Sequence, residues 1–384
     1  MTINIPLFKI YEDDEDIGAI TSVIKRGNNW ANGNEILEFE EKISEYIGTE
    51  YALTFNSGTS AMHALLLANG ISQGDEVIVP SFTFIATANA PLFVKAKPVF
   101  AEIEDKTYGL DPEDLKERIT LKTKAIIPVH YAGCPCLIKE IKEIAEDYNL
   151  FLFEDAAESF GGKVKNQMVG SFGDAGILSF CQNKIITTGE GGAIVTNSKE
   201  LYEKLKLIRS HGRLETQDYF ASSENMDYVT LGYNFRMSTI AAALGISQIK
   251  KVNKIIEMRR NKAAYMTERL SQIEGISLPQ TAHDFYHVYQ MYSIRVDENI
   301  RDSLIKYLSE KGISTKVYFP PIHLTKFYQN DFGYTLGQLP ITEKLSNQFL
   351  SLPIFPTLTE LEMDYIIEEI DNYLGDRDER GTRR

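Results

Sequence analysis

The sequence predicts an α/β fold with a large, mostly parallel sheet, followed by a smaller α+β domain. Between about residues 50 and 200, short apolar runs rich in β-formers alternate with amphipathic helical patterns. Strands that alternate with helices are typical of parallel sheets, in which helices connect neighbouring strands. From about Ser238 onward the pattern becomes mainly helical, and a chain of 384 residues is long enough to form two domains.

Seven short segments are expected to form the strands of the large sheet. They are Tyr51–Phe55, Glu76–Val79, Pro98–Ile103, Ala125–His130, Leu150–Glu154, Ala175–Phe180 and Gly192–Thr196. Amphipathic helices are predicted between them, over Ser60–Asn69, Asp111–Thr120 and Ile138–Tyr148. The last has apolar residues at 138, 141, 144 and 148, a spacing that places them on one helical face.

The second part of the chain is predicted to begin with two helices, over Ile240–Ile249 and Val252–Ile273. Two strand-like runs follow, Tyr289–Val296 and Ser314–Tyr318, with helices around them. We therefore divide the chain into a large domain, residues 1–250, and a small domain, residues 251–384. Because no stretch rich in Pro, Gly and Ser marks the boundary, we expect a long helix to bridge it.

Composition excludes several classes of partner. A net charge of −14 disfavours nucleic acids and anionic membrane surfaces, which repel an acidic protein. No apolar run approaches the roughly 20 residues that cross a bilayer, and the N-terminus has no signal-peptide pattern, so we expect a cytoplasmic protein.

The spacing of the cysteines fits neither a zinc site nor a disulfide framework; they are Cys134, Cys136 and Cys181. We expect reduced thiols and no metal site.

Lys184 stands in an unusual setting, after a predicted strand and before a glycine-rich return, in SFCQNKIITTGEGG at 179–192. A lysine held at a strand end by burial can be a nucleophile toward an aldehyde, and the glycines let the backbone approach a planar ring. The alternative for a lone lysine is a surface residue in a turn. The neighbouring motifs favour the first interpretation.

Asp155 follows the apolar strand FLFE and lies at its carboxyl end, where ligands of open α/β sheets bind. Opposite a pyridoxal phosphate, a carboxylate there would keep the pyridine nitrogen protonated. Alternatively, Glu154 and Asp155 only cap the following turn, and Glu158 is a solvated acid.

The segment NSGTSA, at 56–61, follows the first strand and opens a helix. Amide groups at a helix start, with the hydroxyls nearby, form an anion cradle suited to a cofactor phosphate, although the same residues also make ordinary N-caps.

Phe84, in Phe82-Thr83-Phe84 after the second strand, could stack on a pyridine ring or belong to the core. A dinucleotide site is disfavoured because the first strand leads into NSGTSA rather than GxGxxG.

Together these motifs resemble the DegT/DnrJ/EryC1/StrS family of nucleotide-sugar aminotransferases over almost the whole chain. The resemblance is carried by SGTSA at 57–61, PSFTFIATANA at 80–90, EDAAESFG at 154–161, SFCQNKIITTGEGG at 179–192, HGR at 211–213, GYNFRMS at 232–238 and VYFPPIH at 317–323. It implies the aspartate-aminotransferase fold (fold type I) with pyridoxal 5'-phosphate as cofactor.

The resemblance also implies roles for individual residues. Lys184 would form the Schiff base, Asp155 would face the pyridine nitrogen with Glu158 nearby, and Phe84 would stack on the ring. Gly58, Thr59, Ser60 and Ser179 would bind the phosphate, and Asn234 would reach the phosphate of the neighbouring subunit in a homodimer with shared active sites. The candidates for substrate contact are Trp30, His211, Arg213, Tyr318 and His323.

The resemblance implies a transaminase that takes the amino group of L-glutamate and gives it to a nucleotide-linked keto-deoxy sugar. The segment around Lys184 is most similar to enzymes that make perosamine-type 4-amino sugars, which predicts C4 of a 4-keto-6-deoxyhexose as the acceptor. Amination at C3 uses the same core residues and stays open, as does a regulatory protein that keeps the cofactor without turnover. Cys181 and Gln182 depart from many relatives and are expected to affect substrate preference.

Overall fold

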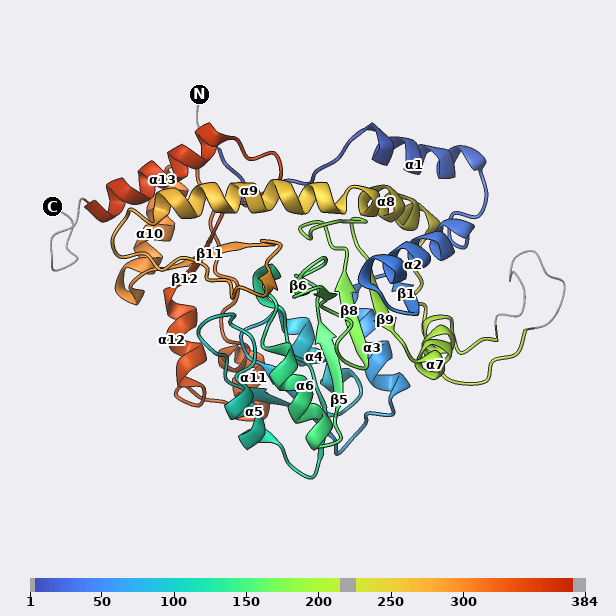
Figure 1. Ribbon diagram of the computed structural model, residues 1–384. Helices are drawn as coiled ribbons and strands as arrows, with labels where there is room; N and C mark the ends of the chain where they lie inside the picture. The colour runs from blue at the N-terminus through green and yellow to red at the C-terminus, as the bar shows by residue number, and fades with distance from the viewer. Residues whose placement is uncertain (1–3, 215–225, 376–384) are drawn as a thin grey trace.

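The computed structural model describes residues 4–214 and 226–375, and it is built around one large central sheet (Figure 1). This seven-stranded sheet has the order β1-β9-β8-β5-β4-β2-β3. All seven predicted segments form its strands: β1 Tyr51–Phe55, β2 Glu76–Pro80, β3 Lys97–Ala101, β4 Thr123–Ile126, β5 Phe151–Asp155, β8 Ala175–Ser179 and β9 Gly192–Thr196. The predicted α/β class is confirmed.

Strand direction brings several chain segments to one edge of the sheet. Strands β3, β2, β4, β5 and β8 run parallel, and β9 is antiparallel to both β8 and β1. In this register, Gly192 pairs with Phe55 on one side and with Ser179 on the other. The carboxyl ends of β1, β5 and β8 therefore lie together, and this edge carries the motifs singled out above.

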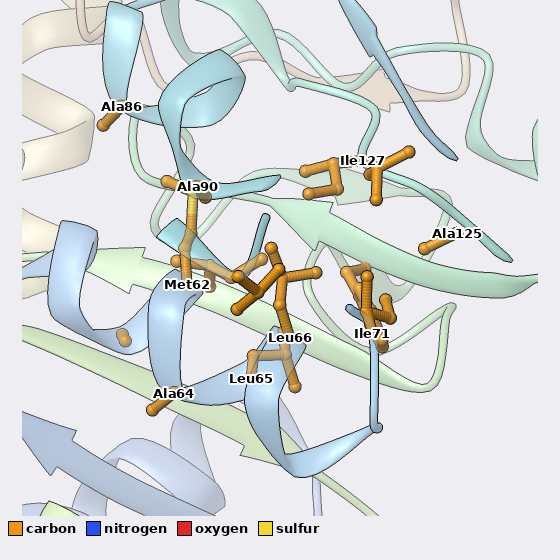
Figure 2. Close-up of a cluster of buried hydrophobic side chains, with 14 of the residues drawn as sticks. Met62, Ala64, Leu65, Leu66, Ile71, Ala86, Ala90, Ala125 and Ile127 are labelled. Carbon is orange, nitrogen blue, oxygen red and sulfur yellow. The ribbon is translucent and has the colours of Figure 1, made fainter. Parts of the chain in front are cut away.

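Helices cover both faces of the sheet. Those of the first part are α1 Asp14–Arg26, α2 Asn34–Ile47, α3 Gly58–Ala68, α4 Ile85–Phe93, α5 Pro112–Arg118, α6 Ile138–Asp147 and α7 Lys199–Arg209. Helix α6 is amphipathic as predicted, with Ile138, Ile141 and Ile144 buried. Helix α3 is apolar on most sides because it is packed between the sheet and other helices, and Met62, Leu65 and Leu66 fill the space between α3, α4 and the sheet (Figure 2).

The second part of the chain contains α8 Thr239–Lys250, α9 Val252–Leu270, α10 Glu298–Glu310, α11 Lys326–Phe332, α12 Pro340–Gln348 and α13 Glu360–Gly375, with strands β11 Tyr292–Arg295 and β12 Phe349–Leu352 paired antiparallel. A separate buried cluster joins α9, α10, α13, β11 and β12, whereas α8 packs with α2 in a cluster of the first part. Small strands β6 Lys163–Val164, β7 Gln167–Met168 and β10 Phe285–Tyr286 form a separate sheet.

One predicted strand of the second part was wrong. Residues 314–318 form no strand, although Lys316 makes an isolated bridge to Ser351 of β12.

The predicted domain boundary at residue 250 falls at the junction of α8 and α9, where Lys251 separates the two helices. Ile5, close to the N-terminus, packs in the buried cluster of the second part. The division into domains stays a prediction.

Membrane insertion through a helix has no support in the described ranges 4–214 and 226–375: no helix there combines the length and the apolar character that a bilayer requires.

The packing of α2 against α8 generates a stability prediction. A Cβ atom at Gly245 in α8 would lie 2.4 Å from the Phe39 ring, which is fully buried in α2. We expect Gly245→Ala to destabilise the protein by about 1–3 kcal/mol through overpacking, seen as a lower midpoint of thermal unfolding.

Gly18→Ala is the matched control, since Gly18 is also helical but a Cβ there meets no atom within 4 Å. Its midpoint should stay or rise, because alanine favours helix by up to about 1 kcal/mol over glycine. Equal midpoints for the two variants would contradict the close packing of α2 and α8.

Candidate active site

Lys184 lies in the turn after β8, and its side chain is mostly buried rather than on the surface. The exposed fraction of the side chain is 14%, and its amine lies 3.6 Å from the carboxylate of Glu158. The surface-turn alternative for Lys184 therefore does not hold. Gln290 donates a side-chain hydrogen bond to the carbonyl of Asn183, which helps to hold the turn that carries the lysine.

Asp155, at the end of β5, is 3% exposed and uses its two oxygens differently. One accepts a hydrogen bond from the backbone N–H of Ala157 at 3.1 Å, the local turn bond of the capping alternative. The other accepts from the hydroxyl of Thr87 in α4 at 2.8 Å. Burial raises the pKa of Asp155, whereas the Thr87 hydroxyl, the Ala157 N–H and the positive charge of Lys184 lower it.

Glu158 is also buried, and it faces the lysine rather than solvent. One carboxylate oxygen accepts from the backbone N–H of Ala132 at 3.0 Å, and the other approaches Lys184. Burial raises the pKa of Glu158, and the nearby ammonium of Lys184 lowers it. The acid is thus a partner of Lys184.

Glu154, next to Asp155 in the strand, points to the opposite side and has a supporting role. It accepts hydrogen bonds from the backbone N–H groups of Gly170, Phe172 and Gly173 at 2.6–2.9 Å. His130 donates to it from Nε2, because Nδ1 of the same ring accepts from the backbone N–H of Cys136. Glu154 therefore stabilises the turn that leads into β8.

The start of α3 combines an N-cap with an anion cradle. Ser57 caps the helix by accepting from the backbone N–H of Ser60 at 3.1 Å. The amides of Gly58 and Thr59 stand in the first turn, where a helix offers no internal acceptor. Ser179 lies beside them: a Cβ at Gly58 would come within 3.4 Å of the Ser179 Cβ. The two alternatives, cap and cradle, are thus compatible.

Phe84 and Tyr318 are aromatic residues at the site. Phe84 is 57% exposed at the start of α4, so it is not a core residue, whereas Phe82 is fully buried. Tyr318 lines a small cavity together with Asn183, and burial together with the negative charge of Glu158 raises the pKa of Tyr318. Both positions leave an aromatic side chain available to a ligand.

The remaining candidates occupy different environments. Trp30 is 47% exposed and donates from its indole to the carbonyl of Val23, while His211 is exposed and Arg213 is buried. Asn234 is exposed, and its backbone forms a bridge to Ser210. His323 is fully buried, with Nδ1 bonded to the Ser81 hydroxyl and Nε2 to the carboxylate of Glu343. Because both ring nitrogens are engaged, we leave His323 out of the proposed substrate site.

Two residues at the site were not singled out from the sequence. Thr87 lies inside the quoted block at 80–90, but only the meeting of α4 with β5 reveals its bond to Asp155. Asn56 accepts from the Ser60 hydroxyl at 2.6 Å and donates to the Asn234 carbonyl at 3.4 Å. Its position beside Ser57 was the available signal.

The residues fit pyridoxal phosphate. The groups that this cofactor needs occur at one edge of the sheet. They are an amine for the aldehyde, a buried carboxylate for a cationic ring nitrogen, an exposed aromatic ring, and first-turn amides for the phosphate. The backbone at the cradle is approached closely by Gly192, where a Cβ would lie 2.5 Å from the backbone nitrogen of Gly58. Lys184 would hold the aldehyde, Asp155 the ring nitrogen, and the start of α3 the phosphate.

Comparisons with known proteins agree with this geometry. A family model described as the DegT/DnrJ/EryC1/StrS aminotransferase family matches residues 11–371. GDP-perosamine synthase of Escherichia coli O157:H7 is 38% identical over 349 residues, which cover 90% of this chain and 92% of that protein.

Two solved structures have nearly the same fold. DesV of S. venezuelae, in complex with a ketimine intermediate, has a TM-score of 0.91 and 32% identity. PseC of Helicobacter pylori, an aminotransferase involved in the biosynthesis of pseudoaminic acid, has a TM-score of 0.91 and 29% identity. Each alignment covers 98% of this chain and 100% of the other. The predicted aspartate-aminotransferase fold is confirmed.

The contact between Thr87 and Asp155 generates a prediction about cofactor affinity. Thr87→Val removes the hydroxyl but keeps the shape, so one oxygen of a buried carboxylate loses its donor and the pKa of Asp155 rises. We expect the affinity of the apoprotein for pyridoxal phosphate, measured by absorbance titration, to fall about tenfold.

Thr83→Val is the control, because the Thr83 hydroxyl bonds to that of Thr87 and makes no bond to Asp155. The loss of cofactor affinity in Thr83→Val should be smaller than in Thr87→Val. If Asp155→Asn bound the cofactor much more weakly while Thr87→Val bound it as the wild type does, the Thr87 hydroxyl would not support the carboxylate.

Proposed function

The chain belongs to the DegT/DnrJ/EryC1/StrS aminotransferase family, and we propose that it moves an amino group from L-glutamate to C4 of a nucleotide-linked 4-keto-6-deoxyhexose. Family membership implies pyridoxal phosphate as the cofactor. The observation that carries the proposal is the meeting of the Lys184 amine with the buried carboxylates of Asp155 and Glu158 at one edge of the sheet.

Lys184 has two tasks in the proposed reaction. Bound pyridoxal phosphate supplies an aldehyde for amines and a ring that stabilises negative charge on the carbon next to the nitrogen. Lys184 would hold this aldehyde in the resting enzyme, and its amine, when free, would carry protons to and from that carbon. Glu158, whose carboxylate lies 3.6 Å from the amine, would help to hold the Lys184 side chain in position.

The other residues bind and orient. Asp155 would hold a proton at the ring nitrogen, and the Thr87 hydroxyl donates to its carboxylate at 2.8 Å. Phe84 would stack on the ring, which requires the exposure that this side chain has. Gly58, Thr59, Ser60 and Ser179 would bind the phosphate, where the partial positive charge of the α3 start favours an anion.

The choice of acceptor rests on similarity. A GDP-perosamine synthase matches over 90% of this chain, and this supports a nucleotide-linked sugar aminated at C4. Amination at C3 would place the same amine and carboxylates around a different ring carbon. It is the second candidate, to be separated from C4 by experiment.

We further propose that the active form is a homodimer with shared sites. Asn234 is exposed, yet its carbonyl accepts from Asn56, beside the phosphate cradle of its own chain. Its side chain would reach the cofactor phosphate of the neighbouring subunit. Each site then needs Lys184 from one subunit and Asn234 from the other.

The transaminase proposal predicts which reaction Lys184 supports. With glutamate and a panel of GDP-, UDP- and dTDP-linked 4-keto-6-deoxyhexoses, the wild type should release 2-oxoglutarate continuously with one sugar. Lys184→Ala should release none, since it has no amine to move the proton. The product's amino position, determined by NMR, decides between C4 and C3.

Lys206→Ala, in α7 at the side of the molecule, is the control and should keep full activity (Figure 1). No release from wild type with any sugar, 3-keto acceptors included, would contradict the transaminase proposal.

Shared sites predict complementation between inactive variants. In a mixed dimer of Lys184→Ala and Asn234→Ala subunits, one site carries both defects and the other carries neither. Random mixing by co-expression should therefore restore about a quarter of wild-type activity, as expected for a two-fold symmetric dimer.

A mixture of Lys184→Ala with Asp155→Ala subunits should stay inactive, because both residues come from the same chain of a site. Equal failure of both mixtures would show that Asn234 does not serve its neighbour.

A further inference from the structure

Lys316 is an exposed lysine whose ammonium is held beside the active site. It lies on the segment that bridges to Ser351, and its Nζ stands 4.8 Å from the centre of the Tyr318 ring. Such a contact with an aromatic face restricts a long side chain that would otherwise sample many rotamers. The ammonium is therefore partly ordered before any ligand arrives.

Tyr318 connects this lysine to the catalytic turn. Tyr318 and Asn183, the residue before Lys184, line one small cavity. This cavity, of about 20 Å³, is also lined by Ser351 and lies between the turn and the Lys316 segment. The backbone carbonyl of Tyr318 accepts from the hydroxyl of Tyr131, which is fully buried.

The charge of Lys316 is not neutralised by its surroundings. Within residues 4–214 and 226–375, no carboxylate oxygen lies within ion-pair distance of its Nζ, whereas the buried acids at the site, Asp155 and Glu158, repel anions. The chain as a whole carries a net charge of −14. An anionic substrate therefore needs a local cation, and Lys316 offers one at the rim.

The position of Lys316 favours the larger of the two proposed substrates. Its ammonium stands over the Tyr318 ring, and Tyr318 in turn shares a cavity with Asn183 in the turn of Lys184. Glutamate has one carboxylate on the carbon that carries the amine and a second carboxylate two methylene groups away from that carbon, and it has no phosphate. In a nucleotide-linked hexose, by contrast, the diphosphate is bonded to C1, across the ring from C4.

We propose that Lys316 binds the diphosphate of the nucleotide-linked sugar and thereby contributes to selecting this class of acceptor. The inference rests on the proposed function and adds to it a residue for substrate recognition. Tyr318 acts as the platform on which the ammonium is placed, and glutamate reacts without using Lys316.

The test uses the full-length holoenzyme with Lys316→Met and Lys316→Arg. Binding of GDP, UDP and dTDP is measured by calorimetry, the KM by turnover of the productive sugar, and the glutamate half-reaction by the change in cofactor absorbance. In Lys316→Met, the Kd of the preferred nucleoside diphosphate and the KM of the sugar should both rise about tenfold. The glutamate half-reaction should not change, and Lys316→Arg should keep most of the affinity because it keeps the charge.

Lys206→Met is the matched control, since Lys206 also places its ammonium over a tyrosine, Tyr202, at 5.4 Å, but in α7. It should bind nucleoside diphosphates as the wild type does. Unchanged diphosphate affinity in Lys316→Met would overturn the inference, and so would an equal slowing of the glutamate half-reaction, which would mean that Lys316 only supports Tyr318. A wild type that binds the diphosphates but does not react with glutamate would reject the proposed function separately.

Discussion

The proposed site depends on a close approach of two backbones, at the start of α3 and the start of β9. A Cβ at Gly192 would lie 2.5 Å from the backbone nitrogen of Gly58, so no larger residue fits there without displacement. Because Gly192 also pairs with Phe55 and Ser179, this contact brings the ends of β1 and β8 together. The phosphate cradle and the turn of Lys184 can meet only in this arrangement.

Strand β5 adds the acids to that edge, and the alternation of side chains in a strand separates their tasks. Glu154 accepts hydrogen bonds from three backbone amides and from His130, and these bonds hold the turn before β8. Asp155, one residue later, faces Thr87 and is the carboxylate that we propose for the cofactor ring. One strand end thus supplies both the support and the chemistry.

The segment of Asn234 is fixed within its own chain although its proposed partner lies in another. The backbone N–H of Asn56 donates to the Phe235 carbonyl at 2.8 Å, and the side chain of Asn56 bonds to both Ser60 and Asn234. The residue that we propose for the neighbouring subunit's site is therefore tied directly to the start of α3 in its own chain. This arrangement would make the two sites of a dimer share one rigid framework.

The sequence alone determined the seven strands and the places of Lys184 and Asp155 at strand ends, because apolar periodicity and turn residues act over a few neighbouring positions. It did not determine the strand order, the bond between Thr87 and Asp155, or the burial of His323 between Ser81 and Glu343. It also predicted a strand over 314–318, where the structure has only a bridge from Lys316 to Ser351. These features belong to the tertiary structure, since the partners lie 68 residues apart for Thr87 and Asp155 and 242 apart for Ser81 and His323, and only packing brings them into contact.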